Sequence, residues 1–162
     1  MKKKYLVTGG AGFIGSNLTD ALIAGNHEVT VIDNLATGRS EYVNQKTRFI
    51  NGDITALESI QKACSGIDGI FHCAALPRVQ RSIANPIETN NTNVTGTLNV
   101  LWAAKTAHVK RVGYAASSSA YGEQKTLPFN ESMRPNPMSP YGLQKYIGEE
   151  YCRLFSMLYG LE

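Results

Sequence analysis

The chain has 162 residues and a formal net charge of +3, from 16 basic and 13 acidic side chains. This length is that of one domain with room for a proper hydrophobic core. Apart from the lysines at positions 2–4, the charges are interspersed, so no nucleic-acid partner is expected. No segment could span a membrane, and the apolar run after the lysines is too short for a signal peptide.

The cysteines and histidines show no metal-ligand spacing, so no metal site is expected. Cys64, Cys73 and Cys152 are odd in number and widely spaced, which is typical of reduced, buried thiols in a cytoplasmic protein. The three histidines are scattered as well. His72 ends a predicted strand, where packing or a hydrogen bond to the backbone is the more common role.

The chain begins with a predicted strand, a glycine-rich turn and a helix. Residues 4–8 form a short β-branched and aromatic run, and apolar side chains recur at helical spacing over residues 13–23. Between them, Gly9, Gly12 and Gly15 allow a tight turn and a close approach of phosphate. The free N–H groups of the helix N-terminus then favour a dinucleotide pyrophosphate. A glycine-rich turn without a ligand is the alternative.

The second predicted strand, residues 28–33, ends on Asp33. Asp33 lies 18 residues after Gly15, near the spacing at which a carboxylate accepts hydrogen bonds from the adenosine ribose. Because this carboxylate would repel a 2′-phosphate, the sequence predicts NAD rather than NADP. Arg39 could accommodate such a phosphate, but a solvated loop residue is the simpler interpretation.

The remaining elements continue the alternation of strands and helices. Their predicted ranges are strands 49–54, 69–73 and 110–116, helices 56–63, 86–107 and 140–159, and a polar loop over 123–137. Asp53, in the third strand, is a candidate for the adenine edge. Its alternative role, shared with Thr55, is to cap the helix over 56–63.

Two helices carry further signals. Asn90, Asn91 and Asn93 are poor helix formers, and we expect them to hydrogen-bond toward the site or to backbone. Ser139 is expected to cap the last helix, which Gly160 ends. The alternation predicts one α/β domain over residues 1–162, a Rossmann-type doubly wound parallel sheet in three α/β/α layers with strand order 3-2-1-4-5.

Three residues form a candidate catalytic group. Tyr141 and Lys145 are four residues apart and therefore share one helix face, where the lysine could lower the pKa of the tyrosine. Tyr141 could then take a proton from a substrate hydroxyl, while Ser117, after the fifth strand, hydrogen-bonds the same oxygen. A solvated helix face and an ordinary serine-rich loop are the alternatives.

Together these motifs resemble those of an extended short-chain dehydrogenase/reductase, in the NAD-dependent nucleotide-sugar epimerase/dehydratase group. The segments that carry the resemblance are 8–16, 33–35, 52–54, 72–75, 93–97, 117–122 and 139–145. The resemblance implies a tightly held NAD and a catalytic triad of Ser117, Tyr141 and Lys145. The implied cofactor-binding residues are Gly9, Gly12, Phe13, Ile14, Asp33, Asn34, Thr37, Gly38, Asp53, Ile54, Ala74, Ala75, Leu76, Thr92, Tyr141 and Lys145. The implied substrate-binding residues are Pro77, Arg78, Ser117, Ser118 and Tyr141.

Within this group, the motifs favour C4 epimerisation of a UDP-sugar through a transient 4-keto intermediate. Dehydratases usually carry an Asp-Glu pair after the catalytic serine, but Ser118 and Ser119 stand there. Segments 74–82 and 114–119 are most similar to UDP-N-acetylglucosamine 4-epimerases, with UDP-glucose as the related alternative. Pro77 and Arg78 depart from the small residues usual at those positions.

The resemblance covers only the N-terminal part of such enzymes, which continue into a sixth strand and a substrate-binding domain. We therefore expect a truncated product, or part of a longer chain, with the fifth strand as an uncovered edge. The alternatives to an epimerase are an NAD-binding fragment without turnover and another nucleotide-sugar enzyme, such as a uronate epimerase, dehydratase or reductase. Family dimers often form through the helix after the fourth strand and the helix that bears Tyr141, which implies a homodimer.

Overall fold

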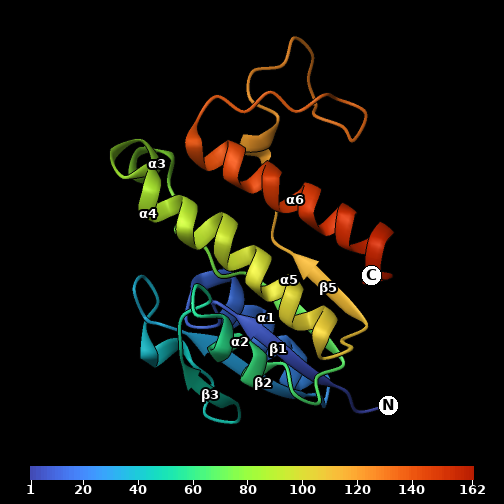
Figure 1. The fold of residues 1–162 in the computed structure, drawn as a ribbon. Coiled ribbons are helices and arrows are strands. Elements are labelled where there is room, and N and C mark those ends of the chain that lie inside the picture. Colours follow the sequence, from blue (N-terminus) through green and yellow to red (C-terminus); the bar gives the residue numbers. More distant parts are fainter.

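The computed structural model describes all 162 residues, which form an open parallel β-sheet with helices on both faces (Figure 1). The strands are β1 (Lys4–Thr8), β2 (Glu28–Asp33), β3 (Arg48–Asn51), β4 (Gly69–His72) and β5 (Arg111–Tyr114). Their order in the sheet is β3-β2-β1-β4-β5, and every neighbouring pair is parallel. The predicted Rossmann-type fold class and strand order are confirmed.

The helices divide between the two faces of the sheet. Helix α1 (Phe13–Ala24) packs on β1 and β2, whereas α2 (Leu57–Ala63), α5 (Thr97–Thr106) and α6 (Pro140–Tyr159) cover the other face. Helices α5 and α6 lie side by side, in yellow-green and orange-red (Figure 1). The short helices α3 (Val79–Ala84) and α4 (Pro86–Asn90) precede α5. None of the helices combines the length and the hydropathy that a membrane-spanning segment requires.

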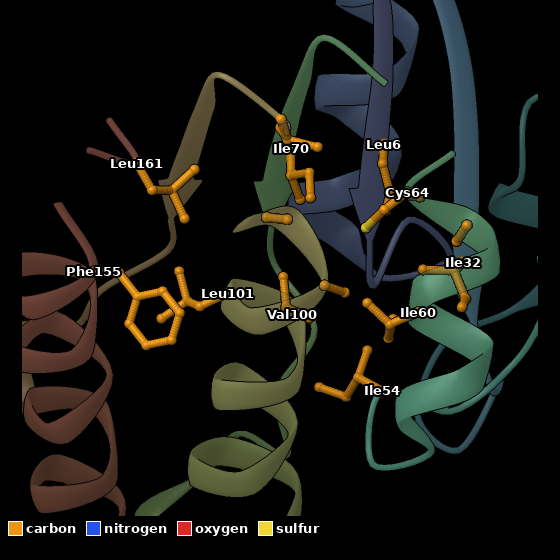
Figure 2. Close-up of a cluster of buried hydrophobic side chains, with 14 residues drawn as sticks. Leu6, Ile32, Ile54, Ile60, Cys64, Ile70, Val100, Leu101, Phe155 and Leu161 are labelled. Atoms are coloured by element: carbon orange, nitrogen blue, oxygen red, sulfur yellow. The ribbon is translucent and has the colours of Figure 1, made fainter. Parts of the chain in front are cut away.

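Alternation along the strands builds a core on each face of the sheet. Leu6 and Ile32 point into the larger cluster, to which α5 contributes Val100 and α6 contributes Phe155 (Figure 2). Val7, the neighbour of Leu6, points the opposite way into a smaller cluster against α1. Because successive side chains of a strand face opposite sides, one apolar run supplies both cores.

The predicted helix over residues 86–107 is interrupted. A π-helical turn, Asn91–Gly96, separates α4 from α5. Asn93 lies inside this turn, is buried, and uses its side chain for hydrogen bonds outside the helix. One extra residue per turn redirects such a side chain without ending the helix. Helix α3 was not predicted, because six residues are too few for a periodic pattern.

Three strands are shorter than predicted, β4 by one residue and β3 and β5 by more. Strand β3 ends at Asn51 because the chain turns at once, with the Ala56 N–H donating to the Asp53 carbonyl. Strand β5 ends at Tyr114, after which only the Ala115 N–H still donates to β4. The N-cap of α2 is Ala56, which has no capping side chain, so the proposed caps of this helix are wrong.

The expectation of an uncovered edge at β5 is wrong at one end. The Glu162 N–H donates to the Lys110 carbonyl at 3.2 Å, and the Val112 N–H donates to the Glu162 carbonyl at 2.7 Å. This is the hydrogen-bond pattern of a parallel pair. The preceding residue, Leu161, is buried in the larger core beside Phe155 (Figure 2).

Candidate active site

A cavity of about 740 Å³ opens at the carboxyl ends of the strands, where open α/β sheets bind their ligands. Sixteen of the residues predicted to bind cofactor or substrate line the cavity: Gly9, Gly12, Phe13, Ile14, Asp33, Asn34, Thr37, Ile54, Ala74, Ala75, Leu76, Pro77, Arg78, Thr92, Tyr141 and Lys145. Four predicted residues are not part of the wall: Gly38, Asp53, Ser117 and Ser118.

Sequence reasoning missed several residues of the wall. They are Ile32, Ala36, Cys73, Gln80, Arg81, Ala115 and Ala116. Cys73, Ala115 and Ala116 directly follow β4 and β5, so the rule that ligands bind at strand carboxyl ends could have identified them. Gln80 and Arg81 belong to α3, which is too short to be predicted from a periodic pattern.

The glycine-rich turn after β1 forms one wall of the cavity. Gly9 has φ +71°, and a Cβ there would lie 2.6 Å from the Ala74 backbone nitrogen, so only glycine fits without a shift. The N-cap of α1 is Gly12, which has no capping side chain. The N–H groups of Phe13, Ile14 and Gly15 therefore have no acceptor within the chain. Free amides at a helix N-terminus suit the pyrophosphate of a dinucleotide.

Asp33 is held in place at the end of β2. Its two carboxylate oxygens accept hydrogen bonds from the N–H groups of Ala11, at 3.0 Å, and Leu35, at 2.8 Å. The residue is half-buried on the cavity wall, so it can still accept from ribose hydroxyls. Arg39 is exposed, lies 3.4 Å from Glu41 and is not part of the wall, in agreement with the solvated interpretation.

Asp53 does not line the cavity but supports a residue that does. One of its carboxylate oxygens accepts from the N–H and the hydroxyl of Thr55, both at 2.8 Å, and the other accepts from the Asn34 amide at 2.8 Å. Burial alone would raise the pKa of this carboxyl, but the hydrogen bonds from Thr55 and Asn34 lower it below its ordinary value. Asp53 thereby orients Asn34, which does line the cavity.

Helix α6 presents Tyr141 and Lys145 to the opposite wall. The helix begins as predicted, with the Ser139 hydroxyl accepting from the Gly142 N–H at 3.1 Å. The Lys145 side chain is not solvated, because the residue is only 4% exposed. Its ammonium donates to the Ala115 carbonyl at 2.9 Å, and burial lowers its pKa to about 8. The interpretation of this face as a solvated helix surface is therefore wrong.

Ser117 lies three residues after β5 and directly follows the wall residue Ala116. It is half-buried and caps a short 3₁₀ turn, Ser118–Ala120, with its Oγ accepting from the Ser119 N–H at 3.2 Å. The Ser117 hydroxyl hydrogen has no acceptor within the chain, so this group can still donate to a substrate oxygen.

Both ring nitrogens of His72 have hydrogen-bond partners, and these are side chains rather than the backbone groups expected from the sequence. Its Nδ1 lies 2.6 Å from the Thr8 Oγ1, and its Nε2 lies 3.0 Å from the Thr97 Oγ1. The Thr97 hydroxyl donates to the Asn93 carbonyl, so it must accept from an Nε2–H. With its hydrogen on Nε2, the neutral ring can only accept at Nδ1, so the Thr8 hydroxyl donates there while its oxygen accepts from the Ala74 N–H. One neutral tautomer fits every bond.

The environment keeps His72 in this neutral form. The residue is 1% exposed, and burial lowers its pKa to about 3, with the positive charge of Lys145 acting in the same direction. His72 is therefore a structural link between the loop at Ala74 and the helix at Asn93 rather than an acid or base.

A second buried link joins the same loop to α6. The Asn93 side chain accepts from the Leu76 N–H at 2.8 Å and donates to the Leu76 carbonyl at 3.1 Å. It also donates to the Gln144 amide oxygen at 2.9 Å, and the Gln144 amide donates to the Thr89 hydroxyl at 3.0 Å. Because Leu76 lines the cavity and Gln144 precedes Lys145, this network holds two walls in a fixed relation.

The fold and the cavity define a dinucleotide-binding domain with a candidate proton-transfer group. The chain matches the NAD dependent epimerase/dehydratase family over residues 5–162. It belongs to this family, and its cofactor is NAD.

Relatives of known structure or function agree with this membership. The chain is 37% identical over 148 residues to the UDP-glucose 4-epimerase of Streptomyces lividans, covering 90% of this chain and 45% of that protein. The structure of a Methanobrevibacter ruminantium UDP-N-acetylglucosamine 4-epimerase in complex with UDP-N-acetylmuramic acid matches with 39% identity and a TM-score of 0.94. The match covers all of this chain and 53% of that chain. A Thermus thermophilus UDP-glucose 4-epimerase, in complex with NAD, matches 98% of the chain and 52% of its own, with 34% identity and a TM-score of 0.91. The chain thus spans about half the length of the relatives it matches.

Proposed function

We propose that this chain is the NAD-binding and catalytic portion of a UDP-sugar 4-epimerase. The observation that carries the proposal is that a candidate cofactor-binding wall and a candidate catalytic wall face one cavity. The free amides of α1 lie on one side, and Tyr141 and buried Lys145 lie on another. A domain that only bound a nucleotide would have no need to bury a lysine beside a tyrosine. UDP-sugar epimerase relatives support the same reaction.

In this proposal Tyr141 is the general base. It takes the proton from the sugar C4 hydroxyl as that carbon becomes a ketone, and it returns the proton after the sugar has turned over. Ser117 donates a hydrogen bond to the same oxygen. Lys145 supports the negative charge of the tyrosinate, because a cation nearby favours the charged form. NAD, held at the glycine-rich turn and at Asp33, supplies the acceptor and later the donor of hydride.

The substrate is proposed as a UDP-sugar of the N-acetylglucosamine or glucose type. This range is supported by one relative that is a UDP-glucose 4-epimerase and another that is a UDP-N-acetylglucosamine 4-epimerase. Ser118 and Ser119 stand where a dehydratase needs carboxyl groups, so elimination of water is not expected. A nearby relative is a UDP-glucuronic acid decarboxylase, at 36% identity, which keeps acidic sugars within the class.

Substitution of Tyr141 by phenylalanine tests the catalytic role. In the enzyme that contains this domain, Tyr141→Phe should nearly abolish epimerisation, because the hydroxyl is needed when the proton moves. NAD affinity, measured by calorimetry, should change little. Substitution of the exposed Tyr42, which lies off the cavity wall, is the matched control. Retention of most of the turnover by Tyr141→Phe would refute the assignment of the base.

A binding module without turnover is the second candidate, because the chain spans only about half of its relatives. The two candidates separate in the enzyme that contains this domain, because only the first predicts that Tyr141→Phe abolishes C4 epimerisation there. A second experiment incubates the purified chain alone with NAD and UDP-N-acetylglucosamine or UDP-glucose. We expect NAD binding without measurable C4 epimer, since remote contacts normally supply the energy that holds and shields a reactive intermediate. Turnover of order 1–10³ per second would show that this domain suffices.

We also propose that the protein works as a homodimer, in a cytoplasmic setting that suits its three unpaired thiols. A groove of about 620 Å³ lies between α4 and the start of α6, bordered by Ile87, Leu143 and Ile147. Ile87 is 83% exposed, which favours burial against a second copy. Light scattering should give a dimer that Leu143→Asp disrupts and Leu127→Asp, on an exposed loop, leaves intact.

A further inference from the structure

Arg78 combines a positive backbone φ with a place on the cavity wall. It lies on the cavity wall at the N-terminus of α3, with φ +82° and ψ +122°. A long side chain rarely adopts positive φ, and such residues concentrate at functional sites, where surrounding contacts hold them. The conformation is therefore a reason to examine what Arg78 contributes to the cavity.

Arg78 is the unpaired cation among the three on the wall. Lys145 is buried and donates to the Ala115 carbonyl. Arg81 lies 2.8 Å from the Glu88 carboxylate. The Arg78 side chain is exposed and forms no hydrogen bond or ion pair within the chain. A guanidinium with its donors free is available to an anion that enters the cavity.

Arg78 also lies at the reacting end of the cavity. Helix α3 packs against α6, and its Ser82 accepts a hydrogen bond from the Tyr141 N–H at 3.0 Å. Arg78 precedes Ser82 by one helical turn. The place of its backbone is thus fixed relative to Tyr141, whereas the free amides of α1, which suit the cofactor pyrophosphate, belong to another wall.

We propose that Arg78 binds a carboxylate on the sugar of the substrate, so that the site prefers an acidic nucleotide sugar, such as a uronate, over a neutral one. This inference rests on the proposed function, since it takes the substrate to be a nucleotide sugar. A neutral hexose offers a free guanidinium only uncharged hydroxyl acceptors. A carboxylate matches its planar fork with two parallel hydrogen bonds.

The test is a comparison of two ligands that differ only at sugar C6, UDP-glucuronate and UDP-glucose. Binding to the NAD-saturated chain is measured by calorimetry for the unmodified protein, Arg78→Ser, Arg78→Lys and Arg39→Ser. Arg39 is the matched control, because it is exposed, lies off the cavity and carries the same charge. It therefore corrects for the general effect of removing one positive charge from a chain of net charge +3.

We expect UDP-glucuronate to bind about 10–100-fold more tightly than UDP-glucose, the range for hydrogen bonds between charged groups. Arg78→Ser should lower the affinity for UDP-glucuronate to that for UDP-glucose and so remove this preference, Arg78→Lys should keep part of it, and Arg39→Ser should keep all of it. The preference should survive in Tyr141→Phe, so it is measurable even if epimerisation is absent.

Three results would overturn the proposal. The unmodified protein could bind both ligands equally or bind neither. Arg78→Ser could weaken both ligands by the same factor, which would place the guanidinium on the nucleotide pyrophosphate. It could weaken NAD itself, which would assign Arg78 to the cofactor. A preserved preference, together with nearly full epimerisation by Tyr141→Phe in the enzyme that contains this domain, would instead refute the proposed function and leave the carboxylate site intact.

Discussion

Replacement of His72 by phenylalanine is the sharpest test of how the cavity is built. Phenylalanine keeps a planar ring in the core but can neither accept from Thr8 nor donate to Thr97, the two partners at 2.6 and 3.0 Å. Both hydroxyls are buried, so each loses a partner without gaining water. An unsatisfied buried group costs about 1–3 kcal/mol, so His72→Phe should lower the free energy of unfolding by about 2–6 kcal/mol at pH 7.

The pH dependence of this loss separates the hydrogen bonds from simple packing. The pKa of His72 is about 3 in the folded protein, against 6.5 for an ordinary histidine. Between these values the unfolded chain binds a proton that the folded chain does not, so stability rises with pH and is lost on acidification. At 1.36 kcal/mol for each pH unit, acidification from 6.5 to 4.5 removes about 3 kcal/mol from the protein with His72 and nothing from the variant at this position.

Urea unfolding followed by circular dichroism at several values between pH 4.5 and 7.5 measures both effects. The stabilities of the two proteins should converge by about 3 kcal/mol toward the acidic end. His108→Asn is the control, because His108 is exposed and has φ +57°, which asparagine tolerates. If the free energies of unfolding of His72→Phe and the unmodified protein changed in parallel with pH, His72 would titrate normally in the fold. The neutral structural link through His72 would then be refuted.

Three further predictions concern other parts of the cavity. The pKa of Lys145 is lowered by burial from 10.5 to about 8, so between these pH values the unfolded chain binds the extra proton. The stability of the unmodified protein relative to Lys145→Met should therefore rise by up to about 3 kcal/mol from pH 8 to 10.5 in denaturant titrations. Gly9→Ala should lower the unfolding temperature and NAD affinity, because its Cβ meets backbone at 2.6 Å. Gly66→Ala has a similar φ of +70° with open space, and should cost only about 1 kcal/mol. Asn93→Ala should lower the free energy of unfolding by about 2–5 kcal/mol, because the N–H and carbonyl groups of Leu76 lose their partner. In the same urea titrations, Asn91→Ala should be nearly neutral, because Asn91 is exposed.

Most of the sheet could be predicted because its signals are local. The run at residues 4–8 and the helical spacing over 13–23 each specify one element, and strand order follows from the connections. The walls of the cavity followed in turn, because parallel strands end at one edge. That is why Asp33 and Ala74 were placed on the wall without knowledge of any contact.

The remaining features depend on contacts between distant residues. The π-helical turn at Asn93 exists because this side chain pairs with Leu76, 17 residues away, and with Gln144, 51 residues away. His72 is neutral because of Thr97 and Thr8, which no local pattern connects to it. The positive φ of Arg78 likewise belongs to a residue type that seldom adopts it, so composition gives no warning.

These long-range links also hold the walls of the candidate site in place. Catalytic groups must be positioned before the substrate arrives, and loops alone are poor supports. Here the loop after β4 is tied to β1 through Thr8 and to the interrupted helix through Asn93. The same asparagine reaches Gln144, whose neighbour in the chain is Lys145. Because buried hydrogen bonds join the two walls, we expect both walls to loosen together when either link is removed.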